Sequence, residues 1–219
     1  MRIRAVVFDL WNTLVDWPIE TSNRLRETWA WHLGITLDRL DELWYDPAAY
    51  RRRESSPLAP VVAELCAAVG SDASVDELVA LRVDVTRCAL QPRDGVLSTL
   101  SELRRRGLRL GLVSNCTEDV ALVWGESALA SSFDAVVFSA TAGCVKPDRR
   151  IYELAAQALS VEPETCIFVG DGANDEIPGA AAAGMRAVLF ERNGDEHAYA
   201  EDWAGERIRA IPDVVSLVA

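Results

Sequence analysis

The chain has 219 residues and a formal net charge of −12; 50% of its residues are hydrophobic and 26% are charged. This length is enough to bury one substantial core and leaves room for a small second module. Surfaces that bind nucleic acid need clustered positive charge, so the acidic balance argues against a nucleic-acid partner. We interpret the one basic run, Arg51 to Arg53, as a solvated helix face; the alternative is a positive rim over an anion-binding pocket.

The cysteines and the first residues bear on the cellular compartment. The five cysteines are an odd, widely spaced set without a CxxC pair, which indicates neither a zinc site nor a disulfide framework. The N-terminus runs directly into a strand-like segment, unlike a signal peptide, and no apolar stretch is long enough to cross a bilayer. We therefore expect a cytoplasmic protein, monomeric or homodimeric, without a membrane partner.

Continuous apolar runs predict the strands. The first run lies between Arg4 and Asp9, and four more follow at Leu108 to Val113, Ala135 to Phe138, Cys166 to Val169 and Ala187 to Phe190. Such runs are typical of a parallel sheet that helices cover on both faces. Helical periodicity separates them, at residues 96–103, where Gly107 follows as terminator, and at residues 151–159. The alternation predicts an α/β fold with a doubly wound, Rossmann-like parallel sheet.

The pattern changes between the first and second strands, where helical stretches dominate and no buried strand is indicated. Ser74 and Glu77 form a capping-box signature there. Four of the seven tryptophans fall in this segment, and we expect them to be core rather than substrate contacts. We predict a core domain of residues 1–15 and 91–219 and a helical insertion, residues 16–90, with a return hinge near Asp94 and Gly95. The four tryptophans are Trp17, Trp29, Trp31 and Trp44.

Polar residues follow four of the predicted strands, and parallel strands place their carboxyl ends on one edge of the sheet. Asp9 follows the first strand and Ser114 with Asn115 the second, whereas Lys146 opens a helix after the third and Asp171 follows the fourth. Each of these residues also has a purely structural explanation. An aspartate or Ser114 can cap a turn or a helix, and Lys146, the only lysine of the chain, can be a solvated charge. Their joint occurrence predicts one site.

These groups suit the transfer of an anionic group. Two carboxylates, Asp9 and Asp171, form a hard oxygen site suited to Mg²⁺. The metal and Lys146 offset the charge of an anionic small-molecule substrate, so that Asp9 can attack it as a covalent nucleophile. Ser114 can donate a hydrogen bond to a transferring oxygen. Glycines on both sides of Asp171 permit close approach of the backbone.

The segments FDLWNTL, LVSN, VKPD and GDGANDEIPGA resemble, in order and separation, the four motifs of the haloacid dehalogenase superfamily. The resemblance covers essentially the whole core, and the helical insertion resembles the cap domain that this family inserts between its first and second motifs. It implies an aspartyl-enzyme intermediate on Asp9, supported by Thr13, with Ser114 and Lys146 binding the transferring group. It also implies Mg²⁺ held by Asp9, Asp171 and the backbone carbonyl of Trp11. Asp175 and Glu176 are expected to orient metal-bound water or Lys146, and one of them is a candidate base.

Two positions depart from this pattern in opposite directions. Phosphatases of the family carry a second aspartate, as general acid and base, where this chain has Trp11, whose indole cannot shuttle protons. The family's 2-haloacid dehalogenases also lack that aspartate. Asn115 and Tyr152 are also similar to residues of these dehalogenases, although phosphatases often have the same two residues. Those metal-free dehalogenases, however, have serine in place of Asp171. Because two buried carboxylates without a cation are costly, the presence of both Asp9 and Asp171 favours Mg²⁺ and a phosphoryl substrate.

The balance predicts a magnesium-dependent phosphatase of a small phosphorylated metabolite. The alternatives are a 2-haloacid dehalogenase and a catalytically weak binding protein that uses the phosphate pocket. We exclude a phosphonoacetaldehyde hydrolase, because members of that branch need a lysine in the cap and the only lysine of this chain is Lys146. Because Trp11 supplies no proton, we expect aryl or acyl phosphates to be preferred over alkyl phosphates unless another acid is present. His32 is the first candidate for such an acid.

Overall fold

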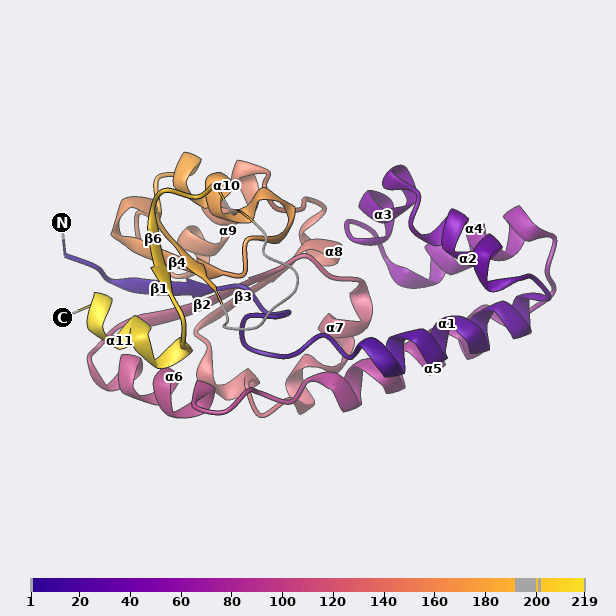
Figure 1. Cartoon of the computed structure of the whole chain (residues 1–219), viewed down its shortest axis with the longest axis horizontal. Helices are drawn as coiled ribbons and strands as arrows, with labels where there is room; N and C mark the ends of the chain where they lie inside the picture. The colour runs from indigo at the N-terminus through magenta and orange to yellow at the C-terminus, as the bar shows by residue number, and fades with distance from the viewer. Residues whose placement is uncertain (1, 192–199, 201, 219) are drawn as a thin grey trace.

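The centre of the computed structural model, which describes residues 2–191, 200 and 202–218, is a six-stranded sheet (Figure 1). All neighbouring strands pair in parallel, in the order β3-β2-β1-β4-β5-β6. This is a doubly wound order, and it confirms the predicted α/β class. The strands are β1 (Ala5–Phe8), β2 (Arg109–Ser114), β3 (Ala135–Phe138), β4 (Cys166–Gly170), β5 (Arg186–Phe190) and β6 (Glu206–Ile208).

All five predicted strands are present, with ends shifted by one residue at most. The residues of β1 and β4 are fully buried, as strands covered on both faces must be. Strand β6, which has the sequence Glu-Arg-Ile and pairs only with β5, was not predicted. A three-residue edge strand with one apolar side chain has no buried run by which it can be recognised.

Helices cover both faces of the sheet (Figure 1). On one face, α6 (Val96–Arg105), α7 (Glu118–Val123) and α11 (Val214–Leu217) contribute to one hydrophobic cluster. On the other face, α9 (Arg149–Ala158) and α10 (Glu176–Ala182) contribute to a second cluster. The shorter elements are α8 (Ser139–Ala142) and the 3₁₀ turns Trp124–Glu126, Ala130–Ser132, Pro163–Thr165, Ala173–Asp175 and Ile211–Asp213.

One prediction about the third strand's connection is wrong in detail. Lys146 does not open a helix: α9 begins at Arg149, with the Asp148 side chain capping it through the backbone N–H of Arg150. The short α8 lies between β3 and the Lys146 loop. An aspartate is a better N-cap than a lysine, since its carboxylate accepts from the free N–H groups of the first turn.

The helical insertion lies between β1 and β2 and extends to one side of the sheet (Figure 1). It has its own hydrophobic cluster, in which Trp29 and Trp44 pack edge to face at 4.9 Å between ring centroids. The core prediction for the tryptophans is confirmed for these two and is wrong for Trp17 and Trp31, which are 38% and 77% exposed. The exact division into residues 16–90 and the rest stays a prediction. Its helices are α1 (Ile19–Leu33), α2 (Leu37–Trp44), α3 (Pro47–Arg53), α4 (Leu58–Val69) and α5 (Val75–Ala89).

Helix α5 begins where the capping signature predicts, because the Ser74 hydroxyl accepts from the backbone N–H of Glu77 at 3.3 Å. No helix among the described residues is both long and apolar enough to cross a membrane.

Buried polar contacts join the helical insertion to α7 of the core. The Arg82 guanidinium on α5 donates to the Asp119 carboxylate at 2.9 Å and to the Thr117 hydroxyl. The Thr86 hydroxyl donates to the other oxygen of Asp119, which is only 1% exposed. Because the described contacts satisfy both carboxylate oxygens inside this interface, Asp119 fixes how the helical insertion sits over the core.

We predict that Asp119→Ala lowers the free energy of unfolding by about 3 kcal/mol, because it leaves the half-buried Arg82 guanidinium without its carboxylate. Glu153→Ala is the control: Glu153 forms an exposed ion pair with Arg149, and its loss should change stability by about 0.5 kcal/mol or less. Urea unfolding of both variants measures the difference. Equal stabilities would contradict a structural role for Asp119.

Candidate active site

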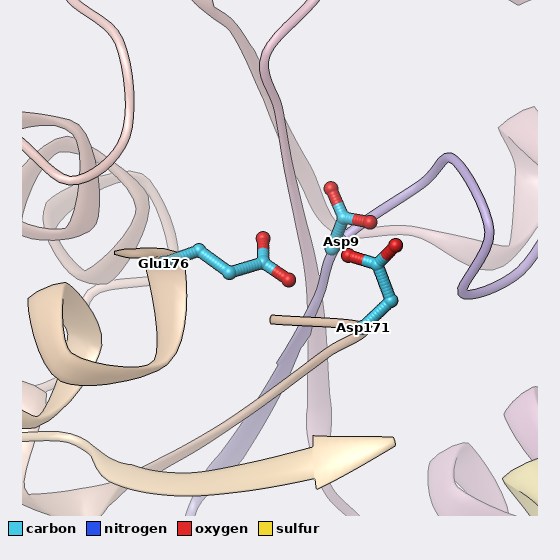
Figure 2. Close-up of side chains that lie close together, drawn as sticks. All are labelled: Asp9, Asp171 and Glu176. Atoms are coloured by element: carbon cyan, nitrogen blue, oxygen red, sulfur yellow. The ribbon is translucent and has the colours of Figure 1, made fainter. Parts of the chain in front are cut away.

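The winding of the sheet reverses between β1 and β4, which creates a crevice at their carboxyl ends. Asp9 follows β1 and Asp171 follows β4, and the backbone N–H of Asp9 donates to the Val169 carbonyl at 2.9 Å. Figure 2 shows their carboxylates facing each other, with the Glu176 carboxylate pointing towards them from α10. The topology therefore brings three acidic side chains from separate segments to one place.

Asp9 is held at both oxygens. Its Oδ2 accepts from the Thr13 hydroxyl at 3.0 Å, and its Oδ1 contacts the Lys146 ammonium. Thr13 is fully buried and Asp9 is 5% exposed, so the carboxylate is fixed in a largely dry environment. A carboxylate that is fixed in this way would lose little conformational freedom in a reaction with a bound molecule.

The backbone of Lys146 is fixed by Asn115. The Asn115 amide accepts from the Lys146 N–H at 2.7 Å and donates to the Lys146 carbonyl at 3.1 Å. The Lys146 ammonium also contacts Glu176, so it bridges two carboxylates. Burial alone would lower the pKa of Lys146, but the charges of Asp9 and Glu176 raise it, and the ammonium stays protonated.

The Glu176 carboxylate fits against the backbone of the β4 loop. Its Oε1 accepts from the Gly172 N–H at 2.9 Å, and the buried Tyr152 hydroxyl donates to the Glu176 carbonyl at 2.8 Å. A Cβ atom at Gly170 would collide with this carboxylate. Glycine at position 170 is therefore a condition for the position of Glu176.

When ionised, the three carboxylates carry more negative charge than Lys146 offsets. One oxygen of each of Asp9, Asp171 and Glu176 lies within 4.8 Å of the others. Burial and then the charge of Asp9 raise the pKa of Asp171, and the same causes raise that of Glu176, with Lys146 opposing. This hard oxygen cluster, short of positive charge, fits a divalent cation such as Mg²⁺. Lys146 is the only lysine of the chain, so no second ammonium group can offset the charge of this cluster.

A cavity of about 600 Å³ opens above these carboxylates, between the core and the helical insertion. The core lines it with Asp9, Trp11, Asn115, Lys146 and Asp171, among others. The helical insertion lines it with side chains that include Tyr50, Arg53 and Glu54. A bound small molecule would therefore contact both parts of the chain.

Three other predicted residues lie outside this cavity. The Ser114 hydroxyl is fully buried and lies 3.4 Å from the Asn115 carbonyl oxygen. Asp175 is exposed, so Glu176 alone of this pair contacts Lys146 in the described structure. His32 lies 4.0 Å from Glu77 and is not among the residues that line the cavity. The roles predicted for them stay predictions.

The interpretation of the basic run is wrong for one of its members. Arg51 and Arg52 are exposed, and Arg52 pairs with Glu64. Arg53 is only 5% exposed, lines the cavity and lies over the rings of Trp44 and Tyr50. Tyr50 and Glu54 also line the cavity and were not predicted as site residues. Their one signal was their place beside the arginines of the proposed positive rim.

The family model described as a haloacid dehalogenase-like hydrolase matches residues 3–184. The chain is 35% identical over 211 residues to "Phosphatase MT3486" of Mycobacterium tuberculosis, a match that covers 89% of this chain and 90% of that protein. It is also 32% identical over 134 residues to "(S)-2-haloacid dehalogenase" of Pseudomonas sp., covering 59% of this chain and 57% of that one. A structure of a "2-Haloacid Dehalogenase" from Pseudomonas syringae has a TM-score of 0.71 and 25% identity, over 99% of this chain and 98% of that one.

The chain belongs to the haloacid dehalogenase-like hydrolases. The predicted resemblance is thereby confirmed, and the relatives include proteins named as phosphatases and proteins named as dehalogenases.

We predict that Gly170→Ala displaces the Glu176 carboxylate, lowers activity and reduces the free energy of unfolding by about 1–3 kcal/mol, a typical effect of overpacking. The matched control is Gly125→Ala, since no atom lies within 4 Å of an added Cβ at that position. Thermal unfolding and turnover of the two variants give the comparison. A Gly170→Ala protein as stable and active as the control would contradict the tight contact.

Proposed function

We propose that the protein is a magnesium-dependent phosphatase that hydrolyses a small phosphorylated metabolite. The observation that carries this proposal is the cluster of Asp9, Asp171 and Glu176 with a single ammonium to offset it. A site with this excess of negative charge suits a metal-assisted reaction on an anionic substrate. The 35% identity with a protein named as a phosphatase supports the same choice.

The residues of the site suit covalent catalysis. Asp9 attacks phosphorus with one carboxylate oxygen, while the Thr13 hydroxyl holds the other. Lys146 offsets the charge of both the nucleophile and the transferred group. Asn115 keeps Lys146 in place, and Ser114 is proposed to contact the transferred group. Mg²⁺, bound by Asp9, Asp171 and the carbonyl of Trp11, would stabilise negative charge on the phosphoryl oxygens.

A second candidate, a 2-haloacid dehalogenase, is favoured by one observation. Trp11, whose ring lies 5.0 Å from that of Trp17, lines the cavity at the position where family phosphatases carry their acid and base. Halide leaves carbon without needing a proton, so that chemistry tolerates a tryptophan there. The relative named "(S)-2-haloacid dehalogenase" gives this candidate weight.

A screen of the purified protein decides between the candidates. Phosphate release from phosphate esters and halide release from 2-haloacids are measured with Mg²⁺ and with a chelator. We expect phosphate release that requires Mg²⁺. Halide release that is unaffected by the chelator would establish the dehalogenase instead, and phosphate binding without turnover would establish a binding protein.

Asp9→Asn should abolish turnover of every substrate, with a loss of roughly 100-fold or more, because an amide is a poor nucleophile. The fold should remain, since the amide can still accept from the Thr13 hydroxyl. Circular dichroism and mass spectrometry control for folding and for deamidation. Near-normal turnover by intact Asp9→Asn protein would refute covalent catalysis by Asp9.

Asp171→Ala should remove Mg²⁺ binding measured by calorimetry, because it deletes one of the carboxylates that the proposed site depends on. Glu153→Ala, which removes an exposed carboxylate from α9, should bind Mg²⁺ as the wild type does. Unchanged binding in Asp171→Ala would show that the metal lies elsewhere.

A further inference from the structure

A phosphatase that acts on alkyl phosphates needs a proton donor for the departing alkoxide, and Trp11 cannot supply one. The structure offers a carboxyl group on the other side of the cavity. Glu54 directly follows α3 of the helical insertion and lines the cavity together with Asp9 and Lys146. A group bound to Asp9 through its phosphorus would therefore project its remaining part towards the side on which Glu54 lies.

The buried carboxyl group of Glu54 lacks a hydrogen-bond partner at one of its oxygens among the described residues. It is 7% exposed, yet no described residue forms a hydrogen bond to its Oε2 atom. A buried carboxyl oxygen without a partner costs free energy unless the group is protonated or a ligand atom contacts it. Its position on the cavity wall provides for such a ligand atom.

The surroundings of Glu54 favour a group that exchanges protons. Burial raises its pKa above the ordinary glutamate value, and Arg53, a hydrogen bond from Tyr50, Lys146 and Arg82 oppose this in that order. The balance leaves the pKa raised, closer to neutral pH, where an acid that must also act as a base works best. The titratable and charged groups that face it are Tyr50 and Arg53 on α3, Arg82 on α5, and Cys116 and Lys146 on the core.

Three neighbouring candidates, His32, Tyr50 and Arg53, are poorer proton donors for the cavity. His32 does not line it. Burial raises the pKa of the Tyr50 hydroxyl, and the charge of Glu54 raises it further, so this phenol is a weaker acid than an ordinary tyrosine. Arg53 stays charged, because guanidinium does not release its proton in proteins.

We propose that Glu54 is the general acid and base of the reaction, an inference that rests on the proposed phosphatase function. In the first step an Asp9 oxygen bonds to phosphorus and the bond from phosphorus to the leaving oxygen breaks. The leaving oxygen takes the electron pair of that bond and the proton of Glu54, and departs as the alcohol. In the second step water attacks phosphorus and gives a proton to the Glu54 carboxylate. The bond from phosphorus to Asp9 breaks, its electron pair returns to Asp9, and inorganic phosphate leaves.

The test is Glu54→Gln, which keeps the shape of the side chain and removes its exchangeable proton. Specificity constants are measured for 4-nitrophenyl phosphate, whose leaving group departs without a proton, and for glycerol phosphate, whose alkoxide needs one. Glu54→Gln should lose about 100- to 10,000-fold on glycerol phosphate and less than about tenfold on 4-nitrophenyl phosphate. Glu64→Gln, an exposed glutamate of the same insertion, is the control and should match the wild type on both.

The pH profile is the second measurement. Glu54 must be protonated for the first step, so the wild-type specificity constant for glycerol phosphate should fall as the pH rises through the Glu54 pKa, and Glu54→Gln should lack this limb. Equal losses on both substrates, a change in KM alone or an unchanged pH profile would overturn the role of Glu54, while wild-type phosphate release keeps the proposed function intact. No phosphate release by the wild type from any ester would overturn the proposed function and this inference together.

Discussion

The constraint on which the candidate site depends is the close approach of three carboxylates, two of them buried, beside one buried ammonium. Lys146 contacts Asp9 and Glu176, one oxygen of Asp171 lies within 4.8 Å of both carboxylates, and the interior gives these charges little screening by water. Such a cluster is costly, and breaking any one ion pair would leave an unpaired buried charge. A bound cation and an anionic substrate would offset this cost, which links the electrostatics of the site to the proposed chemistry.

The sheet supplies the rigidity that this arrangement needs. Asp9 and Asp171 follow adjacent strands, β1 and β4, whose residues are fully buried, so the separation of the two carboxylates is set by strand pairing. Glu176 comes from the helix after β4 and approaches only because residue 170 is glycine. The site is thus built on regular elements, with Gly170 at the end of β4 and Asn115 in the loop after β2 adjusting it.

The sequence predicted the half of the site that lies on the core, and the physical reason is simple. Buried parallel strands appear as apolar runs, and a polar residue at the end of each run must lie at one edge of the sheet, as Asp9 and Asp171 do. The half on the helical insertion could not be predicted in this way. Which helix face meets the cavity depends on docking contacts such as that between Arg82 and Asp119, which join residues far apart in the chain. Glu54 therefore looked like any other charged residue of the insertion, whereas His32 was predicted from its residue type alone.

This difference bears on how a hydrolase of this family can tolerate Trp11. If the acid stood on the core, its geometry would be fixed relative to Asp9, and every leaving group would meet it. With Glu54 on the helical insertion, the proton donor is part of the surface that lines the other side of the cavity, beside Tyr50 and Arg53. A leaving group that fails to fill that side leaves the carboxyl group too far from its oxygen, since proton transfer needs hydrogen-bond contact. Recognition of the leaving group and its protonation would then depend on the same few side chains, so that the wrong ester is bound by the core but not cleaved.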